Sequence, residues 1–250
     1  NITLSCLHLY KNKNLWMGTT SNGIYCLSED KSLSRPVTKG NITSIYEDSS
    51  NELWIGSWEE GLYRVKTDGN IENLRHNPMN TNSLCSNFVR SCCEDNSGDL
   101  WIGTFNGLNR YDRETGKFHL YTANGNSPDG LTHSSIWCIV KDGQGTIWLG
   151  TYFGGVNYFN PEYEIYTRYK VGDTEKAGLS SPIVGRMTED KDGNLWICTE
   201  GGGVNVYDRI NNTYRWYRHE EGRNSISHNN VKAIYYDRAN EIMWIGTHLG

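Results

Sequence analysis

The sequence predicts an all-β protein, a β-propeller of four-stranded antiparallel blades, and three observations carry this prediction. A Trp-centred motif occurs six times in the 250 residues. Its tryptophans are separated by 38, 47, 47, 48 and 48 residues, a period typical of propeller blades. The composition combines 12% aromatic residues with 27 glycines and only 5 prolines, which favours short strands joined by tight turns. The six tryptophans are Trp16, Trp54, Trp101, Trp148, Trp196 and Trp244.

Each repeat predicts four strands in a fixed order. The first strand has two apolar positions three residues apart, such as Ile42 and Ile45, as a buried strand requires. A turn rich in Asp, Asn and Gly precedes the Trp strand, and we expect its recurring Asp, such as Asp48, to cap that turn. The Thr or Ser that ends the Trp strand is expected to hydrogen-bond the following turn. A glycine then precedes the third strand, and a short aromatic fourth strand ends the repeat.

The repeats predict one continuous propeller with five complete blades and the first hairpin of a sixth. A repeat array needs protected ends, because each terminal sheet otherwise exposes a face. The last hairpin has no complementary strand in the chain, so we expect a fragment of a larger propeller. The blades are predicted at about residues 1–39, 40–84, 85–132, 133–180 and 181–227, with the partial blade at 228–250.

Charge and cysteine content argue against several classes of function. The net charge is −5 and no basic cluster stands out, so we expect no nucleic-acid contact. No apolar run is long enough for a transmembrane helix. The seven cysteines are an odd number without zinc-type spacing. Most stand where the other repeats carry small or apolar residues, so we expect buried free thiols.

Two repeats and two links carry a resemblance to a known family. Gly98–Asp112, Asn194–Asp208, Asn82–Val89 and Asn224–Val231 resemble the regulator-propeller repeat of the periplasmic sensor region of Bacteroidetes hybrid two-component systems. The resemblance covers essentially the whole chain. It implies a seven-bladed propeller in the periplasm that binds oligosaccharides from polysaccharide breakdown. It also implies a homodimeric receptor with further propeller and sandwich domains, a membrane helix, a histidine kinase and a response regulator.

Ligand-binding residues are expected where the repeats differ, on the face formed by the interblade links and the turns after the Trp strands. Aromatic side chains stack on the apolar faces of sugars, and Arg, Asn and Glu bind their hydroxyl groups. Arg also suits uronate or sulfate groups. The alternative, that these aromatics only pack at the blade ends, stays open. The candidates are Trp58, Arg90, Phe105, Asn106, Trp137, Tyr152, Arg186 and Glu200.

Catalysis is not expected, because the sequence has no nucleophile-elbow, zincin or P-loop motif. No cofactor or metal is predicted. Asp190–Asn194 is similar to the start of a calcium loop but lacks the distal Glu that such a loop requires. Two alternatives stay open. One is a propeller lyase or other carbohydrate-active enzyme, for which His248 with Glu200 is the one pair to nominate, and the other is a protein-interaction scaffold.

Overall fold

The computed structural model describes residues 2–10, 13–37, 39–123, 130–160, 165–174 and 177–248. Every regular element in these ranges is a strand. The strands form five four-stranded antiparallel sheets and one two-stranded sheet, each ordered as in the chain. This arrangement confirms the predicted architecture of five complete four-stranded antiparallel blades and a partial sixth. Within the described residues, no helix has the length and apolar character needed to cross a membrane.

The blades contain four strands each, here named A to D in chain order. Blade 1 comprises β1 (Leu4–Leu9), β2 (Leu15–Thr19), β3 (Ile24–Leu27) and β4 (Leu33–Val37). Blade 2 comprises β5 (Ile42–Glu47), β6 (Leu53–Ser57), β7 (Leu62–Val65) and β8 (Ile71–Leu74). Blade 3 comprises β9 (Val89–Glu94), β10 (Leu100–Thr104), β11 (Leu108–Asp112) and β12 (Lys117–Tyr121).

The second half of the chain repeats this order. Blade 4 comprises β13 (Ile136–Lys141), β14 (Ile147–Thr151), β15 (Val156–Asn160) and β16 (Ile165–Tyr169). Blade 5 comprises β17 (Val184–Glu189), β18 (Leu195–Thr199), β19 (Gly203–Asp208) and β20 (Thr213–Tyr217). The last hairpin comprises β21 (Val231–Asp237) and β22 (Ile242–Thr247).

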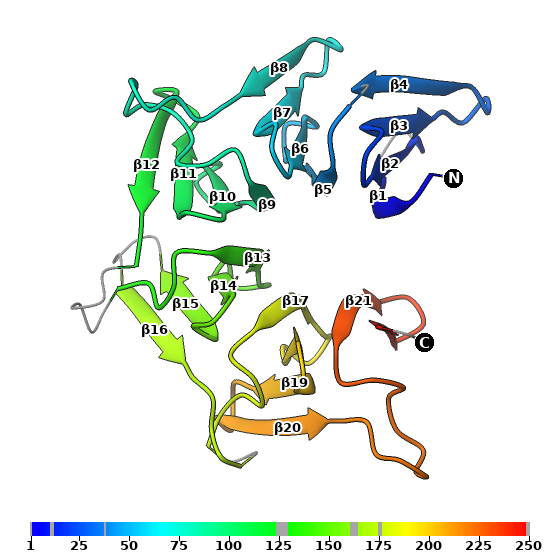
Figure 1. Ribbon diagram of the computed structural model, residues 1–250, viewed down its shortest axis with the longest axis vertical. Coiled ribbons are helices and arrows are strands. Elements are labelled where there is room, and N and C mark those ends of the chain that lie inside the picture. The colour runs from blue at the N-terminus through cyan, green and yellow to red at the C-terminus, as the bar shows by residue number, and fades with distance from the viewer. Residues whose placement is uncertain are drawn as a thin grey trace. The chain divides into compact units, whose positions relative to one another are not determined.

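The chain forms two compact units, Asn1–Tyr121 with blades 1 to 3 and Thr122–Gly250 with blades 4, 5 and the last hairpin (Figure 1). Within the first unit the A strands β1, β5 and β9 are neighbours, and within the second β13, β17 and β21 are. Each blade has two ends. We call the end with the A–B and C–D turns the turn end, and the end with the B–C turns and interblade links the link end.

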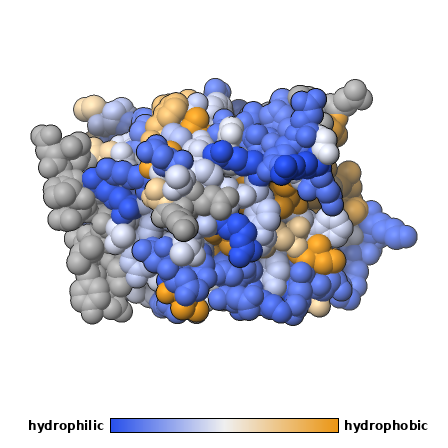
Figure 2. Space-filling view, turned by 90° about the horizontal axis from the view of Figure 1, so that it is seen from below, coloured by the Kyte–Doolittle hydropathy of each residue, from blue (hydrophilic) through white to orange (hydrophobic). Residues whose placement is uncertain are grey.

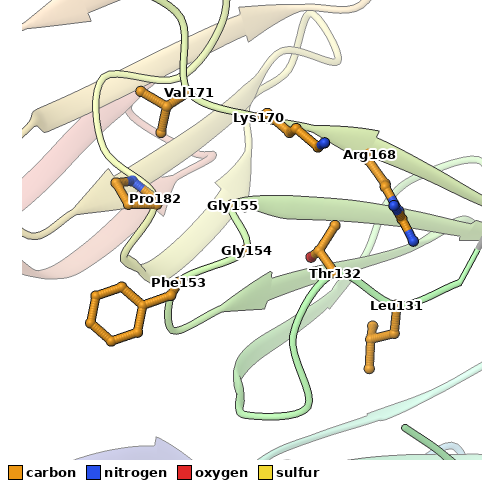
Figure 3. A pocket seen from close by; sticks show the side chains of 9 residues that line it. All are labelled: Leu131, Thr132, Phe153, Gly154, Gly155, Arg168, Lys170, Val171 and Pro182. Atoms are coloured by element: carbon orange, nitrogen blue, oxygen red, sulfur yellow. The ribbon is translucent and has the colours of Figure 1, made fainter. Parts of the chain in front are cut away.

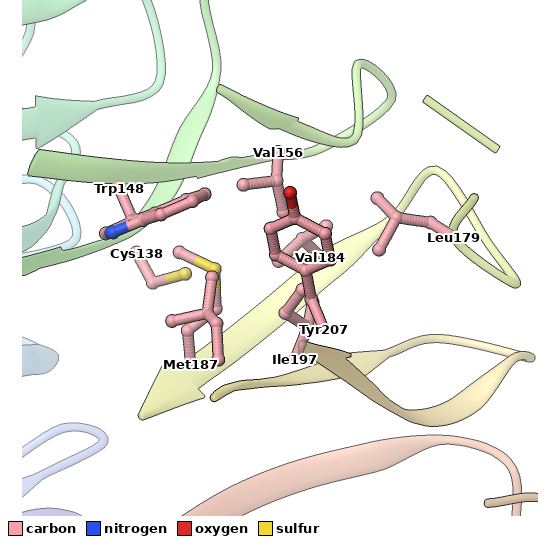
Figure 4. Packing of buried hydrophobic residues seen from close by; sticks show 9 residues of the cluster. Cys138, Trp148, Val156, Leu179, Val184, Met187, Ile197 and Tyr207 are labelled. Atoms are coloured by element: carbon pink, nitrogen blue, oxygen red, sulfur yellow. The ribbon is translucent and has the colours of Figure 1, made fainter. Parts of the chain in front are cut away.

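The Trp strands form the core of the blades, because a sheet packed on both faces must be apolar on both. Every residue of β6, β10 and β14 is buried, and Trp54, Trp101 and Trp148 are at most 1% exposed. Trp148 belongs to a cluster in which Cys138 and Val156 of blade 4 meet residues of blade 5, among them Tyr207 (Figure 4).

Blade 1 and the last hairpin depart from the expected burial. Leu4 and Leu7 occupy the two apolar positions of β1 but are 50% and 60% exposed, and Trp244 of β22 is 60% exposed. The prediction of a buried strand was therefore wrong for β1. The physical reason is that, within its unit, β1 packs against β5 on one side only, so its other face has no covering blade there.

The B–C turn follows one hydrogen-bonding plan. Gly61 has a φ of +79°, and a Cβ there would lie 2.4 Å from the carbonyl oxygen of Leu74, so a side chain would be both strained and obstructed. The hydroxyl of Ser57 donates to the carbonyl of Gly61 over 2.9 Å. Thr19, Thr104, Thr151 and Thr199 make the same contact in their blades, which confirms the expected role of this position.

The turn end is held by a repeated Asp–Trp contact. Asp48 Oδ1 accepts the backbone N–H groups of Ser50 and Glu52, each over 2.9 Å, so the Asp caps its turn as predicted. Its Oδ2 accepts the indole N–H of Trp54 over 2.6 Å. The indole N–H groups of Trp101, Trp148 and Trp196 donate likewise to the Asp six residues earlier. The polar atom of each tryptophan is thereby satisfied inside the core.

Two arginines join neighbouring blades at this end. Arg113, after the C strand of blade 3, reaches Asp48 of blade 2 over 2.7 Å and Glu94 of its own blade over 3.3 Å. Arg209 of blade 5 pairs in the same way with Asp142 of blade 4 and with Glu189. We call each such group of Asp, Trp, Glu and Arg an interblade lock. Because Asp48 and Asp142 are buried, each lock balances a desolvated charge.

All seven cysteines are free, as predicted, and five of them are buried. Cys6 and Cys85 are half-buried. Burial raises the pKa of the Cys92 thiol, and it raises the pKa of Cys138 to about 12. These thiols are therefore protonated and unreactive in the folded chain.

Candidate functional site

In the first unit, four side chains gather at the link end; we call them the Trp58 cluster (Trp58, Phe88, Arg90 and Phe105). The ring of Trp58 meets Phe88 edge-on at 5.5 Å between centroids, and Phe88 lies 6.2 Å from Phe105. The guanidinium of Arg90 lies 4.4 Å from the centroid of the Trp58 ring, within reach of a cation–π attraction. Phe105 is 47% exposed. The cluster thus offers an open aromatic surface beside a positive charge.

The strands explain why these residues meet. Trp58 and Phe105 follow the B strands of blades 2 and 3, and their N–H groups donate to carbonyls of Asn41 and Phe88 in the interblade links. Arg90 is the second residue of β9. The corresponding residue of blade 2, the second residue of β5, is Thr43. The Thr43 hydroxyl bonds the carbonyl of Val89 in the next blade. At the equivalent position the longer side chain of Arg90 reaches the ring of Trp58.

In the second unit, the link end carries a second group, the Trp137 cluster (His133, Trp137, Tyr152 and Phe153). Trp137 and Tyr152 stack at 5.1 Å with an interplanar angle of 7°. Tyr152 meets Phe153 edge-on at 4.4 Å, and His133 lies 6.2 Å from Phe153. Phe153 is 55% exposed. Flat, partly exposed rings of this kind suit the C–H faces of a sugar.

A cavity of about 580 Å³ adjoins this cluster in the second unit (Figure 3). Phe153, Val171 and Pro182 provide apolar wall, and Arg168 and Lys170 at the end of blade 4 provide positive charge. Arg168 donates to the carbonyl of Gly130 through Nε at 2.9 Å and Nη2 at 2.7 Å, which fixes its guanidinium. Lys170 is exposed, and no ion pair joins it to another described residue. The cavity therefore offers apolar contact together with one fixed and one mobile cation.

The other predicted residues are placed differently. Asn106 is exposed next to Phe105, and its backbone N–H donates to the Thr104 hydroxyl over 3.2 Å. Glu200 forms an ion pair with Lys232 of the last hairpin. Arg186 acts on two buried thiols: burial raises the pKa of Cys138 and Cys198, and the positive charge of Arg186 opposes that rise. Arg186 and Glu200 thus belong to blade 5 of the same unit, where Glu200 is held by Lys232.

The pair nominated for catalysis does not form. The ring of His248 lies 5.9 Å from that of His228, whereas Glu200 binds Lys232. The structure therefore gives His248 and Glu200 separate partners. Among the residues that the structure describes, no three His, Cys, Asp or Glu side chains are grouped to hold a metal ion.

Sequence reasoning missed the cavity and two members of the clusters. Phe88 and His133 lie in the interblade links, and Arg168 and Lys170 belong to a D strand and its continuation. The comparison of repeats concentrated on the B–C turns and the A strands. A signal was present in the link of blade 3, where Phe88 directly precedes the apolar position of Val89.

The surface seen in Figure 2 is mostly hydrophilic, with apolar residues in small separate groups. The most exposed apolar side chains, Met79 at 93% and Ile210 at 87%, belong to turns and links of different units.

Comparison with known families matches the two component regulator propeller five times, at residues 36–59, 83–106, 130–153, 178–201 and 225–248. The chain belongs to this repeat family. Each match includes an interblade link and ends in the turn after a Trp strand, and the first four matches also contain the Asp–Trp contact. The first Trp hairpin, Leu4–Thr19, lies outside the five matches. A comparison with curated proteins finds no match.

Solved structures similar to this regulator propeller show the same fold. The extracellular domain of hybrid two component system BT4673 from B. thetaiotaomicron is 19% identical to this chain, with a TM-score of 0.54. The alignment covers 100% of this chain and 41% of that domain. The extracellular domain of BT3049 from the same organism is 23% identical, with a TM-score of 0.50. That alignment covers 98% of this chain and 37% of the domain. This chain spans about two fifths of the length of these domains.

An enzyme shares the fold as well. An inactive virginiamycin B lyase from Staphylococcus aureus with quinupristin is 14% identical, with a TM-score of 0.69. The alignment covers 98% of this chain and 84% of the lyase. At this identity the likeness concerns the fold alone, which hosts different functions.

Proposed function

We propose that this regulator propeller is part of the extracytoplasmic sensor region of a hybrid two-component system and that its link end binds an oligosaccharide. The family and the similar solved structures, which are extracellular domains of such systems, support the sensor role and the location. The observation that carries the ligand proposal is the cavity of about 580 Å³ beside the Trp137–Tyr152 stack.

The chemistry of this cavity favours an acidic sugar. A stacked aromatic pair and Phe153 present apolar faces, which match the C–H faces of a pyranose. Arg168 and Lys170 line the cavity together with Phe153, which links it to the stacked pair through Tyr152, and their charges complement a uronate carboxylate or a sulfate group. The chain as a whole is acidic, with a net charge of −5. Two cations at one cavity are therefore a local feature of that site.

The sensor role implies recognition without turnover. We propose that the ligand is released unchanged and that binding acts on the kinase through the rest of the receptor, which requires different affinities for two receptor arrangements. The homodimer and the further propeller and sandwich domains that the resemblance implies remain predictions. The same holds for the seven-bladed closure.

The first experiment measures binding of neutral and uronate-containing oligosaccharides by isothermal titration calorimetry, with recovery of the sugar afterwards. We expect a uronate oligosaccharide to bind and to be recovered intact. Lys170→Met removes the mobile cation, keeps most of the apolar stem, and should weaken binding about tenfold, the effect of losing one charge-assisted contact. Lys31→Met alters an exposed lysine of a turn in the first unit and is the matched control.

Three results would contradict the proposal. Equal binding of neutral and acidic sugars would remove the role of Arg168 and Lys170. Cleavage of the sugar would favour the lyase alternative. Absence of binding to any sugar, in a chain whose melting temperature shows it to be folded, would favour the protein-interaction scaffold.

A further inference from the structure

Blade 1 lacks the contact that satisfies its tryptophan. The indole N–H of Trp16 is buried and has no hydrogen-bond partner, although Trp16 is only 8% exposed. In blades 2 to 5 the corresponding N–H donates to a carboxylate six residues earlier. Six residues before Trp16 stands Tyr10. Buried polar groups are nearly always paired in folded proteins, so this donor requires an explanation.

The backbone of blade 1 is not the cause. Tyr10 N–H donates to the Asn14 carbonyl over 2.9 Å, and Lys13 N–H donates to the Tyr10 carbonyl over 2.8 Å. Asp48 makes the same two turn contacts with Glu52 and Asn51, each over 3.0 Å. Tyr10 therefore occupies the position of the lock Asp with the same two backbone hydrogen bonds, and its hydroxyl donates to the carbonyl of Asn51.

The arginine of the lock is missing as well. Arg113 and Arg209 are each the fifth residue after the first apolar residue of their C strand, Leu108 and Val204. The corresponding residue of blade 2 is Thr67. Blades 1 and 2 thus lack both the Asp and the Arg of an interblade lock. Tyr10 of blade 1 and Thr67 of blade 2 stand at the two positions that would otherwise pair.

A cavity of about 340 Å³ lies where the lock would be. Trp16 and Tyr10 line it from blade 1, and Leu53 and Ile71 line it from blade 2. Lys66 and Thr67 are its polar wall on the side of the C–D turn. Trp16 lines this wall, but its indole nitrogen is itself buried, so a molecule in the cavity accepts the hydrogen bond only once a side chain of the wall moves aside.

The charges around the cavity select against an anion. Lys66 is already paired with Glu72, and Arg64 is paired with Glu52 at 2.7 Å. Glu47 lies 3.1 Å from His8, and Asp48 is bound by Arg113. Burial and the charges of Glu47 and Asp48 raise the pKa of Tyr10, which indicates a negative potential at this wall. A buried carboxylate would lack the arginine that balances it in the true locks.

We propose that the cavity between blades 1 and 2 is a binding site for a small uncharged molecule with an apolar body and an oxygen acceptor, held by the indole N–H of Trp16. The apolar body packs against Trp16, Leu53 and Ile71, and a hydroxyl or carbonyl oxygen takes the place of the lock carboxylate. This site lies at the turn end of the first unit. It is independent of the proposed oligosaccharide site, which lies at the link end of the second.

The test follows the indole N–H of Trp16 by ¹H–¹⁵N correlation NMR. Its signal is assigned by its loss in Trp16→Phe. Benzamide is the neutral probe with an acceptor, benzoate is its anionic counterpart, toluene lacks the acceptor, and methyl glucoside tests whether the acceptor can come from a sugar. We expect benzamide or methyl glucoside to shift the Trp16 signal with millimolar affinity, and benzoate and toluene to bind more weakly. The Trp54 signal, already bound to Asp48, should not move.

Two variants sharpen the result. Tyr10→Asp restores the acceptor of the sister blades, should move the Trp16 signal towards those of Trp54 and Trp101 without ligand, and should weaken benzamide binding about tenfold. Tyr10→Phe removes only the contact with Asn51 and should leave binding intact. The proposal is overturned if neither neutral probe moves the Trp16 signal, if benzoate binds as well as benzamide, or if Tyr10→Asp leaves binding unchanged.

Discussion

The two ends of each blade use the same repeat for opposite purposes. At the turn end, blades 2 and 3 and blades 4 and 5 are joined by the same four residue types, Asp, Trp, Glu and Arg. At the link end, equivalent positions carry Thr43 in one blade, Arg90 in the next and Trp137 in another. Uniform positions hold neighbouring sheets together, and variable positions on the same scaffold carry the residues that we propose bind a ligand. On that proposal, stability and recognition are separated along each strand.

The sharpest way to break this comparison is to remove one tryptophan from each end of the same hairpin. Trp54→Ala deletes a fully buried side chain from the core and should destabilise the first unit by about 3–5 kcal/mol. Trp58→Ala removes an edge-on contact with Phe88 and a cation–π contact with Arg90, worth about 1 kcal/mol. Urea unfolding followed by circular dichroism measures both. Equal losses would show that the Trp58 cluster is structural.

A second variant sharpens the role of the lock. Asp48→Ala leaves the indole N–H of Trp54 and two turn amides without their acceptor, and Arg113 keeps only Glu94. Removing one partner of a buried ion pair typically costs about 3–5 kcal/mol, and partial exposure of Arg113 places the expected loss at the lower limit. Asp237→Ala is the control, since that Asp caps a turn but binds no Trp or Arg in the described chain. Similar losses from the two variants would refute the lock.

The smallest expected effect concerns pH. Burial alone would raise the pKa of Asp190, but hydrogen bonds from Trp196 and Asn194 outweigh it and hold this pKa below its ordinary value. A depressed carboxyl pKa stabilises the fold above the unfolded-state value, about 3.9, and this contribution is lost as the pH falls through the folded-state value. Asp190→Asn should therefore lower the melting temperature slightly at pH 7, and the difference should vanish towards pH 2. A pH-independent difference would assign the effect to packing.

The blades could be predicted from the sequence because their signal is repeated. Six Trp motifs at a near-constant spacing leave little freedom in strand order, and the capping role of Asp48 and its counterparts follows from turn chemistry. The Asp–Trp contact was equally visible as a constant spacing of six residues, yet its meaning depends on a side-chain direction that periodicity does not contain. Leu4 and Leu7 misled the prediction, because an apolar pattern marks a face suited for burial but does not supply the partner.

The candidate site was predictable in position but incomplete in composition. Trp58, Phe105 and Tyr152 follow Trp strands, so their place at the link end follows from the hairpin alone. Phe88 and Lys170 lie in segments whose lengths differ between repeats, and their approach to these rings depends on tertiary packing. Whether the eight predicted residues bind a ligand remains a prediction that the binding experiments address.

The buried thiols have a consequence for how long this chain would last under oxidising conditions. Cys92, Cys138 and Cys198 lie inside the sheets with pKa values raised by burial, so oxidants and disulfide-exchanging enzymes meet no thiolate while the blades are closed. Each opening of a blade gives them access. The rate at which these cysteines become modified therefore reports the rate of blade opening. A ligand that holds neighbouring blades together would lower both rates and keep the protein intact for longer.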